Sequence, residues 1–309
     1  MIPAAFWAAV GLLLLRINAI GNAARRPAFL AAALAVIGIA TVGVVWPVKH
    51  IDAFLGDVNS IDLIQVLAAT AAFWFLRDAT RAHAGSAARS RLPILITVLL
   101  AETVTFIAIP DHNGEPTTYI HEHLQYPATW VHIVIYMVAM GWFAADSIGV
   151  LLPQPRGVNI LFIIGFALVV LSIIAELVDI TRVFIDGQQT PFSRAMLVAF
   201  NSLFYPGLVA IGVAHGWRTL RRLITVLGWR LISFRLFVMS TRDQSAGRPP
   251  LRLQGSAEVV AAQRYIELRD KIVAGRLEVT EQQQRYLQRV DERLAKGVTA
   301  WALSVQQQG

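Results

Sequence analysis

The chain has 309 residues, of which 56% are hydrophobic and only 15% are charged, and its formal net charge is +7. Soluble globular domains carry about 25% charged residues. Together with a mean hydropathy of +0.55, this composition excludes an ordinary soluble protein and indicates a multi-pass protein of the cell membrane. The chain has no cysteine, so disulfides and thiolate metal ligands are excluded as well.

Seven apolar stretches approach the roughly 20 residues that cross a bilayer. They cover about 2–20, 28–48, 59–76, 92–110, 128–150, 159–180 and 195–215. The first is not preceded by the basic residues of a cleaved signal peptide, which predicts an uncleaved helix with its N-terminus outside. We therefore predict an all-α fold, in which residues 1–216 form a polytopic bundle of seven transmembrane helices and a helical tail lies in the cytoplasm.

The basic residues between these stretches support that orientation, because short cytoplasmic loops carry an excess of Arg and Lys. Eight basic residues fall on the predicted inner side and three on the outer side. The inner set is Arg16, Arg25, Arg26, Arg77, Arg81, Arg89, Arg91 and Arg156, and the outer set is Lys49, Arg182 and Arg194.

Segment 217–239 combines large apolar residues with five arginines. We predict an amphipathic helix in the membrane interface, where guanidinium groups can contact lipid phosphates. An eighth span would instead bury Arg230 near the membrane centre and place the C-terminus outside. The predicted lipid-contacting residues are Arg218, Arg221, Arg222, Arg230 and Arg235.

Residues 240–255 are polar and contain Gly and Pro, which predicts a linker. Residues 256–309 then predict a cytoplasmic helical hairpin. In its first helix Ala261, Tyr265, Leu268 and Ile272 share a face, and Gly275 ends it. Thr280 and Gln283 form a capping box for the second helix, whose apolar seam contains Leu287, Val290, Leu294, Val298 and Trp301. This seam either packs on the first tail helix or binds a cytoplasmic partner or a second copy of the chain.

Two sequence segments, WPVKHIDAFLGDVNSIDLIQVL and QRYIELRDKI, occur in a chain that also has seven apolar stretches and an Arg-rich juxtamembrane segment. In this combination the chain resembles a family of actinobacterial seven-helix membrane proteins. The family is provisionally described as transporters, with a cytoplasmic tail domain of unknown function. The resemblance implies the topology given above and supplies no catalytic residues.

The polar residues inside the apolar stretches point to a site, because lipid cannot satisfy them and they are expected to face other helices. We predict an outward-facing polar cavity with Glu102 at its floor, binding a small ligand or a proton. Glu102 is either protonated or ionised and paired with His132. The alternative for each residue is a structural hydrogen bond between two helices. The predicted site residues are Glu102, His132, Glu176, Asn201 and Tyr205.

No nucleotide-binding or catalytic motif occurs, and no cofactor is predicted. His112, His121 and His123 offer zinc ligands without the spacing of a known site, so no metal is predicted, although a metal-dependent extracytoplasmic enzyme is one alternative. The basic excess at 216–250 suits anionic lipid better than nucleic acid. We expect a signalling or regulatory protein that relays a change in the cavity through its tail. A small-solute transporter is the main alternative.

Overall fold

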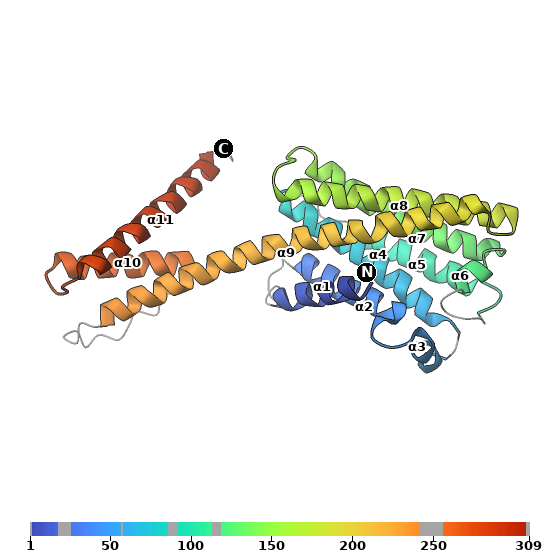
Figure 1. The fold of residues 1–309 in the computed structure, drawn as a ribbon, viewed down its shortest axis with the longest axis horizontal. Helices are drawn as coiled ribbons and strands as arrows, with labels where there is room; N and C mark the ends of the chain where they lie inside the picture. The colour runs from blue at the N-terminus through green and yellow to red at the C-terminus, as the bar shows by residue number, and fades with distance from the viewer. Residues whose placement is uncertain are drawn as a thin grey trace. The chain divides into compact units, whose positions relative to one another are not determined.

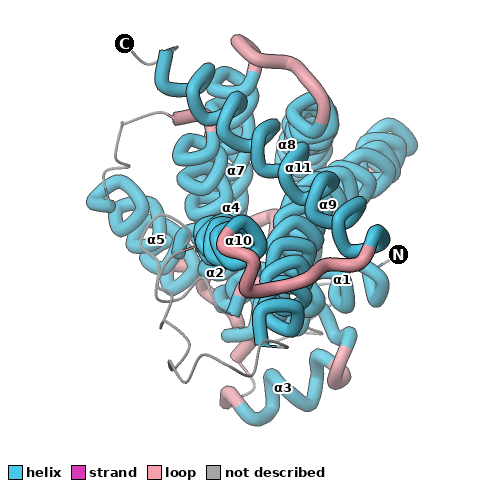
Figure 2. Tube along the Cα trace, turned by 90° about the vertical axis from the view of Figure 1, so that its left-hand side faces the viewer, coloured by secondary structure: helices cyan, strands magenta, loops and turns pink. Residues whose placement is uncertain are grey.

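The computed structural model of the protein describes residues 2–17, 26–56, 58–85, 92–112, 119–241 and 256–306. Within these ranges the chain contains helices and loops and no strand, as Figure 2 shows. The predicted all-α class is therefore confirmed. The chain divides into two compact units, Met1–Thr219 and Leu220–Gly309, which we describe separately.

The first unit is a bundle of helices that pack side by side (Figure 1). Contacts join α2 to α4, α4 to α7, α7 to α8, and α5 to both α4 and α7. The helices are α1 (Ile2–Leu15), α2 (Arg26–Ile39) with its π-helical continuation η2 (Ala40–Val44), α3 (Val48–Phe54), α4 (Ser60–His83), α5 (Leu92–Ile107), α6 (Tyr119–Glu122), α7 (Pro127–Leu151), α8 (Val158–Asp186) and the first part of α9 (Pro191–Thr241).

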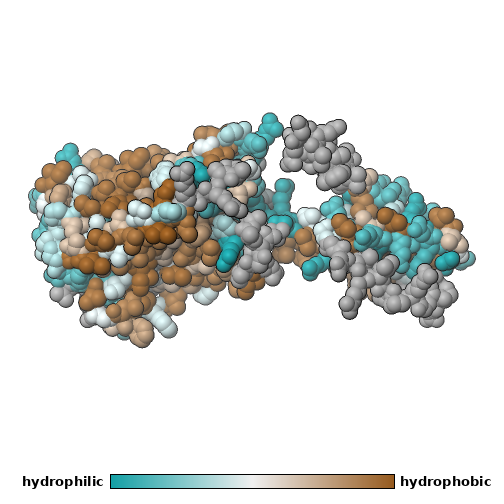
Figure 3. Space-filling model, turned by 180° about the vertical axis from the view of Figure 1, so that it is seen from behind, coloured by the Kyte–Doolittle hydropathy of each residue, from teal (hydrophilic) through white to brown (hydrophobic). Residues whose placement is uncertain are grey.

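Five described helices are long and apolar enough to cross a membrane, and each overlaps a predicted span. They cover Arg26–Val44, Ser60–His83, Pro127–Leu151, Val158–Asp186 and Pro191–Ser240. The sequence predicted seven. The other two predicted spans correspond to α1 with 14 residues and α5 with 16, both shorter than the roughly 20 residues that a hydrocarbon core requires. Apolar side chains cover much of the visible face of this unit (Figure 3), as expected for a surface that contacts lipid.

Gly43 explains why the second helix ends before the predicted residue 48. Its φ of 85° lies in the left-handed region, which residues with a Cβ rarely adopt. A Cβ at this position would also lie 2.9 Å from Cγ2 of Val48. The chain therefore turns after η2 and enters α3.

Two glycines bring α8 and α9 into close contact. A Cβ built on Gly207 would lie 2.9 Å from the carbonyl oxygen of Gly165, and a Cβ built on Gly165 would lie 2.9 Å from that of Gly207. Small residues allow helix backbones to approach closely in membrane proteins. This contact fixes α9 against α8 one residue after Pro206, which lies inside α9.

The second unit consists of residues 220–241 of α9 together with α10 (Ala257–Val273) and α11 (Glu281–Gln306). Its visible surface is largely hydrophilic (Figure 3). The predicted caps are confirmed. Thr280 N donates to Gln283 Oε1 over 2.8 Å, Gln283 N donates to Thr280 Oγ1 over 3.4 Å, and Gly275 follows α10 with a φ of 67°.

The apolar core of this unit corrects one prediction. Residues 217–239 do not form a separate interfacial helix, because α9 is continuous to Thr241. Side chains from its last turns pack against α10 and α11. This core consists of Trp229, Ile232, Leu236, Met239, Ala261, Tyr265, Leu268, Leu287 and Val290, with Ile272 and Leu294 partly buried beside it.

The predicted partner seam on α11 is therefore filled within the chain at Leu287, Val290 and Leu294. The seam therefore packs on the first tail helix, as one of the predicted alternatives had it, and α9 packs there as well, which the sequence did not indicate. The side chains of Val298 and Trp301, the other two seam residues, lie outside the described residues. So do positions 242–255, most of the predicted linker.

Candidate functional site

Glu102 lies in α5 and is completely buried. Oγ1 of Thr70, in α4, donates a 2.6 Å hydrogen bond to Glu102 Oε1. The second carboxyl oxygen, Oε2, is buried and has no hydrogen-bond partner among the described residues. The prediction that Glu102 faces protein is therefore confirmed.

His132 of α7 is also completely buried, and it contacts the backbone of α5. Its Nδ1 lies 3.0 Å from the carbonyl oxygen of Glu102 and 3.2 Å from Thr105 Oγ1. A carbonyl oxygen can only accept, so Nδ1 carries a proton and donates. Among the described residues no ion pair joins the imidazole to the Glu102 carboxylate within 4.0 Å. The predicted pairing of these two side chains is therefore not observed.

Tyr136 brings the other acidic residue of the site into the same group. It lies one helical turn after His132 on α7, near enough to Glu102, to Glu176 of α8 and to Tyr205 of α9 for their charges to act on its hydroxyl. The Glu176 side chain is 8% exposed and its Oε2 has no hydrogen-bond partner among the described residues. We call Thr70, Glu102, His132, Tyr136 and Glu176 the Glu102 cluster.

Two features of the predicted cavity differ from the structure. Asn201 is exposed and donates to the carbonyl oxygen of Leu197 in its own helix over 3.0 Å, so the structure leaves it outside the Glu102 cluster. In addition, Glu102 and His132 have no exposed surface at all. Glu102 is therefore sealed among side chains, where an open cavity floor was predicted.

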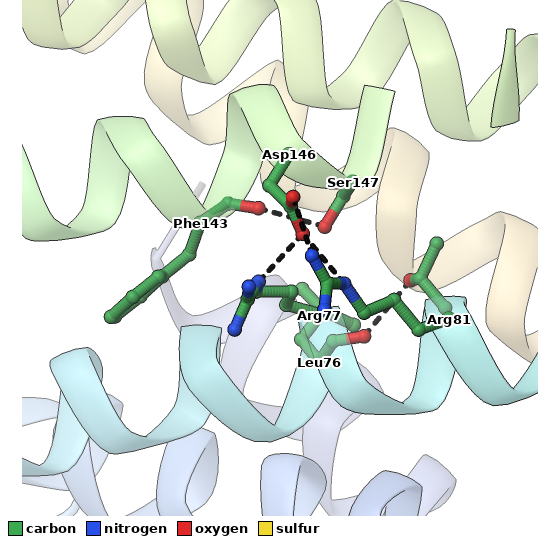
Figure 4. Close-up of polar contacts among 7 residues, drawn as sticks. Leu76, Arg77, Arg81, Phe143, Asp146 and Ser147 are labelled. Atoms are coloured by element: carbon green, nitrogen blue, oxygen red, sulfur yellow. Dashed lines mark hydrogen bonds and ion pairs between the residues drawn. The ribbon is translucent and has the colours of Figure 1, made fainter. Parts of the chain in front are cut away.

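A second polar cluster joins α4 directly to α7, about two turns further along α4 from Thr70 (Figure 4). Arg77 Nε donates to Asp146 Oδ2 over 2.6 Å. Arg81 binds both carboxylate oxygens, with Nη2 2.7 Å from Oδ1 and Nε 2.9 Å from Oδ2. The Arg77 guanidinium also lies 4.9 Å from the ring centre of Trp74. We call Arg77, Arg81 and Asp146 the Asp146 ion-pair cluster.

This cluster was not predicted from the sequence, because Arg77 and Arg81 follow the predicted third span and were assigned to a cytoplasmic loop. Both residues lie within α4, which continues to His83. Their spacing of four residues places them on one face of a helix, and that spacing was the available signal. Both arginine side chains are mostly buried, with 6% and 19% exposed.

A third group of polar residues links the loops at the predicted outer end. The buried Asn59 has a φ of 53°. Its backbone N–H donates to Asp52 Oδ2 over 3.1 Å, and its side-chain amide donates to the carbonyl oxygen of His112 over 2.7 Å. Tyr119 donates to the carbonyl oxygen of Asp111 over 3.0 Å. Burial raises the pKa of the Tyr119 hydroxyl above its ordinary value, so this donor keeps its proton.

The loop histidines do not form a metal centre with the acids around them. Across the described parts of the chain, no three His, Asp or Glu side chains are placed so that they could hold a metal ion. His123 Nδ1 lies 2.8 Å from the Tyr119 carbonyl oxygen, and His112 Nδ1 lies 2.9 Å from the Tyr119 hydroxyl. These contacts hold both rings against Tyr119 at the start of α6.

The five arginines predicted to contact lipid have different environments. Arg218 donates to Asn159 Oδ1 and lies over the Phe162 ring inside the first unit. Arg235 is exposed and its guanidinium lies 4.3 Å from the ring centre of Tyr286. Arg221, Arg222 and Arg230 are exposed.

Comparison with protein-family models, with curated proteins and with solved structures finds no match to this chain. The geometry supports a membrane protein with five candidate spans among the described helices. In it the sealed acidic cluster links α4 and α7 through α5, and a network of ion pairs joins α4 to α7 directly.

Proposed function

We propose that the protein is a proton-responsive signalling protein of the cell membrane, in which Glu102 exchanges a proton and the helical tail carries the output. In this proposal the chain spans the membrane seven times, with the N-terminus outside and the tail in the cytoplasm, as in the family it resembles. The two shorter helices, α1 and α5, complete the seven.

The observation that carries this proposal is the sealed environment of Glu102. A buried carboxylate needs a cation or several hydrogen-bond donors to offset its lost hydration, and the described residues supply one hydroxyl, from Thr70. No water-sized space adjoins the side chain, which is 0% exposed. Of the two stimuli that the sequence suggested, a small ligand or a proton, the proton fits a sealed carboxyl group.

The path from Glu102 to the other end of the bundle would run through α4 and α7. Helix α4 carries both Thr70, bonded to Glu102, and Arg77, bonded to Asp146. Helix α7 carries both His132, bonded to the backbone of residue 102, and Asp146. A shift of α5 that follows a change in charge at Glu102 would therefore act on the two helices that the ion pairs hold together.

The test uses the full chain in proteoliposomes, with hydrogen exchange measured by mass spectrometry. The external pH is varied between about 5 and 8, the range in which acidic stimuli act on biological switches. We expect exchange in peptides from 76–85 and from 257–273 to change with pH in the wild type. Glu102→Gln is expected to abolish this change, because glutamine keeps the Thr70 hydrogen bond and cannot ionise.

Glu278→Gln is the matched control, because Glu278 is exposed between α10 and α11, outside the measured peptides, and its replacement removes the same charge. An unchanged pH response in a folded Glu102→Gln protein would refute the proposal. Proton-driven uptake of a solute by the same proteoliposomes, retained after deletion of residues 251–309, would identify a transporter instead.

A further inference from the structure

A second candidate site lies in the first unit, away from the Glu102 cluster. It is a cavity of about 270 Å³ between α1, α2, α4 and α9. All but two of its lining residues are apolar, and the two exceptions are Arg16 and His215. The volume lies just below the roughly 300–1,000 Å³ of sites for drug-sized ligands, which suits a single hydrocarbon chain.

Small side chains create this space. Four alanines of α2, at positions 28, 31, 32 and 35, line the cavity, and their spacing places them on one face of the helix. Ala9, Ala72 and Gly212 line it from α1, α4 and α9. Leucine at these positions would fill the cavity, since packed helices usually bury side chains of that size at such contacts.

Arg16 supplies a cation at this apolar cavity. Its Nη2 lies 2.9 Å from His215 Nδ1 and 3.3 Å from Thr219 Oγ1. Arginine donates only, so His215 accepts at Nδ1 and its ring is neutral. A guanidinium has five N–H donors. Two are used by His215 and Thr219, which leaves three without a partner among the described residues.

A second guanidinium lies in the same part of the unit. The His215 ring packs edge-on against Phe162, with 4.7 Å between ring centres, and Arg218 lies over the same Phe162 ring at 4.5 Å. In the described parts of the chain no carboxylate lies within 4.0 Å of the nitrogens of Arg16 or Arg218. Two partly buried cations without an acidic partner attract an anion.

From this juxtaposition we propose that the cavity binds an anionic lipid, with one hydrocarbon chain among the alanines of α2 and the phosphate on the free N–H groups of Arg16. A fatty acid has the same chemistry, because it too is a small anion attached to a hydrocarbon chain. The experiment below distinguishes a fatty acid from a phospholipid. Binding of a lipid here would be a property in addition to the proposed proton response. It does not require Glu102.

The test is native mass spectrometry of the full chain released from nanodiscs that contain phosphatidylcholine with a minor fraction of phosphatidylglycerol. We expect wild-type protein to retain one phosphatidylglycerol per chain. Arg16→Gln is expected to weaken this binding about tenfold, the effect of losing a charge-assisted hydrogen bond. Arg16→Lys is expected to retain most of it, because the charge remains. Ala35→Leu is expected to abolish it by filling the cavity.

Arg156→Gln is the matched control, since Arg156 is exposed in a loop and its replacement makes the same change in net charge. Palmitate and inorganic phosphate are added as competitors. Displacement by palmitate would assign the site to a single-chain carboxylate, and resistance to it would assign the site to the phospholipid.

Three results would overturn the proposal. They are equal retention of phosphatidylcholine, complete displacement by inorganic phosphate alone, and unchanged retention in either Arg16→Gln or Ala35→Leu. Circular dichroism and a single peak on size exclusion establish that each variant is folded. Because Glu102→Gln leaves this site intact, failure here would not affect the proton-sensing proposal.

Discussion

Thr70 and Glu102 are joined by a 2.6 Å hydrogen bond that links α4 to α5 inside the apolar bundle. The hydroxyl is the one donor that the described residues give to the Glu102 carboxyl group. Burial of a polar group is costly when its partner is removed, by about 1–3 kcal/mol. The bond therefore stabilises the contact between these helices in addition to any role in proton exchange.

Replacing Thr70 by valine tests this contribution, because valine keeps the shape and loses the donor. We expect Thr70→Val to lower the free energy of unfolding by about 1–3 kcal/mol, measured by thermal unfolding in detergent. Glu102→Gln is expected to stay within about 1 kcal/mol of wild type, since the amide oxygen still accepts. Thr103→Val is the control, because the one bond of the Thr103 hydroxyl within the described residues goes to the carbonyl oxygen of Leu99 in its own helix. An equal loss in both threonine variants would contradict this assignment.

Removing the charge of Asp146 is predicted to be more damaging than removing either arginine. Asp146→Asn removes the carboxylate that binds both guanidinium groups, and breaking a buried ion pair costs about 3–5 kcal/mol. Because the Asp146 side chain is 21% exposed, we expect a loss near the lower end of that range. Chemical unfolding of Asp146→Asn, Arg77→Gln and the double variant measures the coupling.

Asp186→Asn provides the comparison for this series, because Asp186 is exposed at the end of α8. It removes the same charge without breaking a described pair. Additive effects in the double variant would show that Arg77 and Asp146 do not stabilise one another.

The close approach of α8 and α9 predicts that Gly207 does not tolerate even a methyl group. A Cβ there would lie 2.9 Å from the Gly165 carbonyl oxygen and 3.0 Å from Val169 Cγ2. We expect Gly207→Ala to destabilise the unit by about 1–3 kcal/mol through overpacking, measured as a lower Tm. Gly149→Ala is matched to it, since a Cβ at Gly149 has no atom within 4 Å, and it is expected to be neutral or stabilising.

The tail core predicts a difference between two neighbouring apolar residues of α10. Leu268 is completely buried against α9 and α11, whereas Ile266 is 59% exposed. We expect Leu268→Ala to destabilise the second unit by about 2–5 kcal/mol and Ile266→Ala to have little effect. Limited proteolysis of the full chain within residues 257–294 measures this. Equal protection in the two variants would show that the helices do not pack as described.

Local patterns in the sequence were sufficient to locate the helices and to predict the ends of the tail helices at Gly275 and Thr280. Apolar runs located the helices, because an unpaired backbone in lipid is too costly for any other open structure. The capping box at Thr280 and Gln283 and the glycine at 275 act within one helical turn, so their effect can be read from neighbouring residues alone. That Glu102 faces other helices followed from the same argument, since lipid offers no partner to a carboxyl group; its complete burial did not.

Which residues meet across helices was decided only by the tertiary structure. The rotation of each helix and the distance between neighbours depend on packing, for which a single sequence gives no direct signal. This is why Thr70 was not identified as the partner of Glu102, why Arg77 and Arg81 were assigned to a loop and not to Asp146, and why the seam on α11 was left without α9. The alanines of α2 form a cavity with Arg16 for the same reason: they leave space only when α1, α4 and α9 surround them.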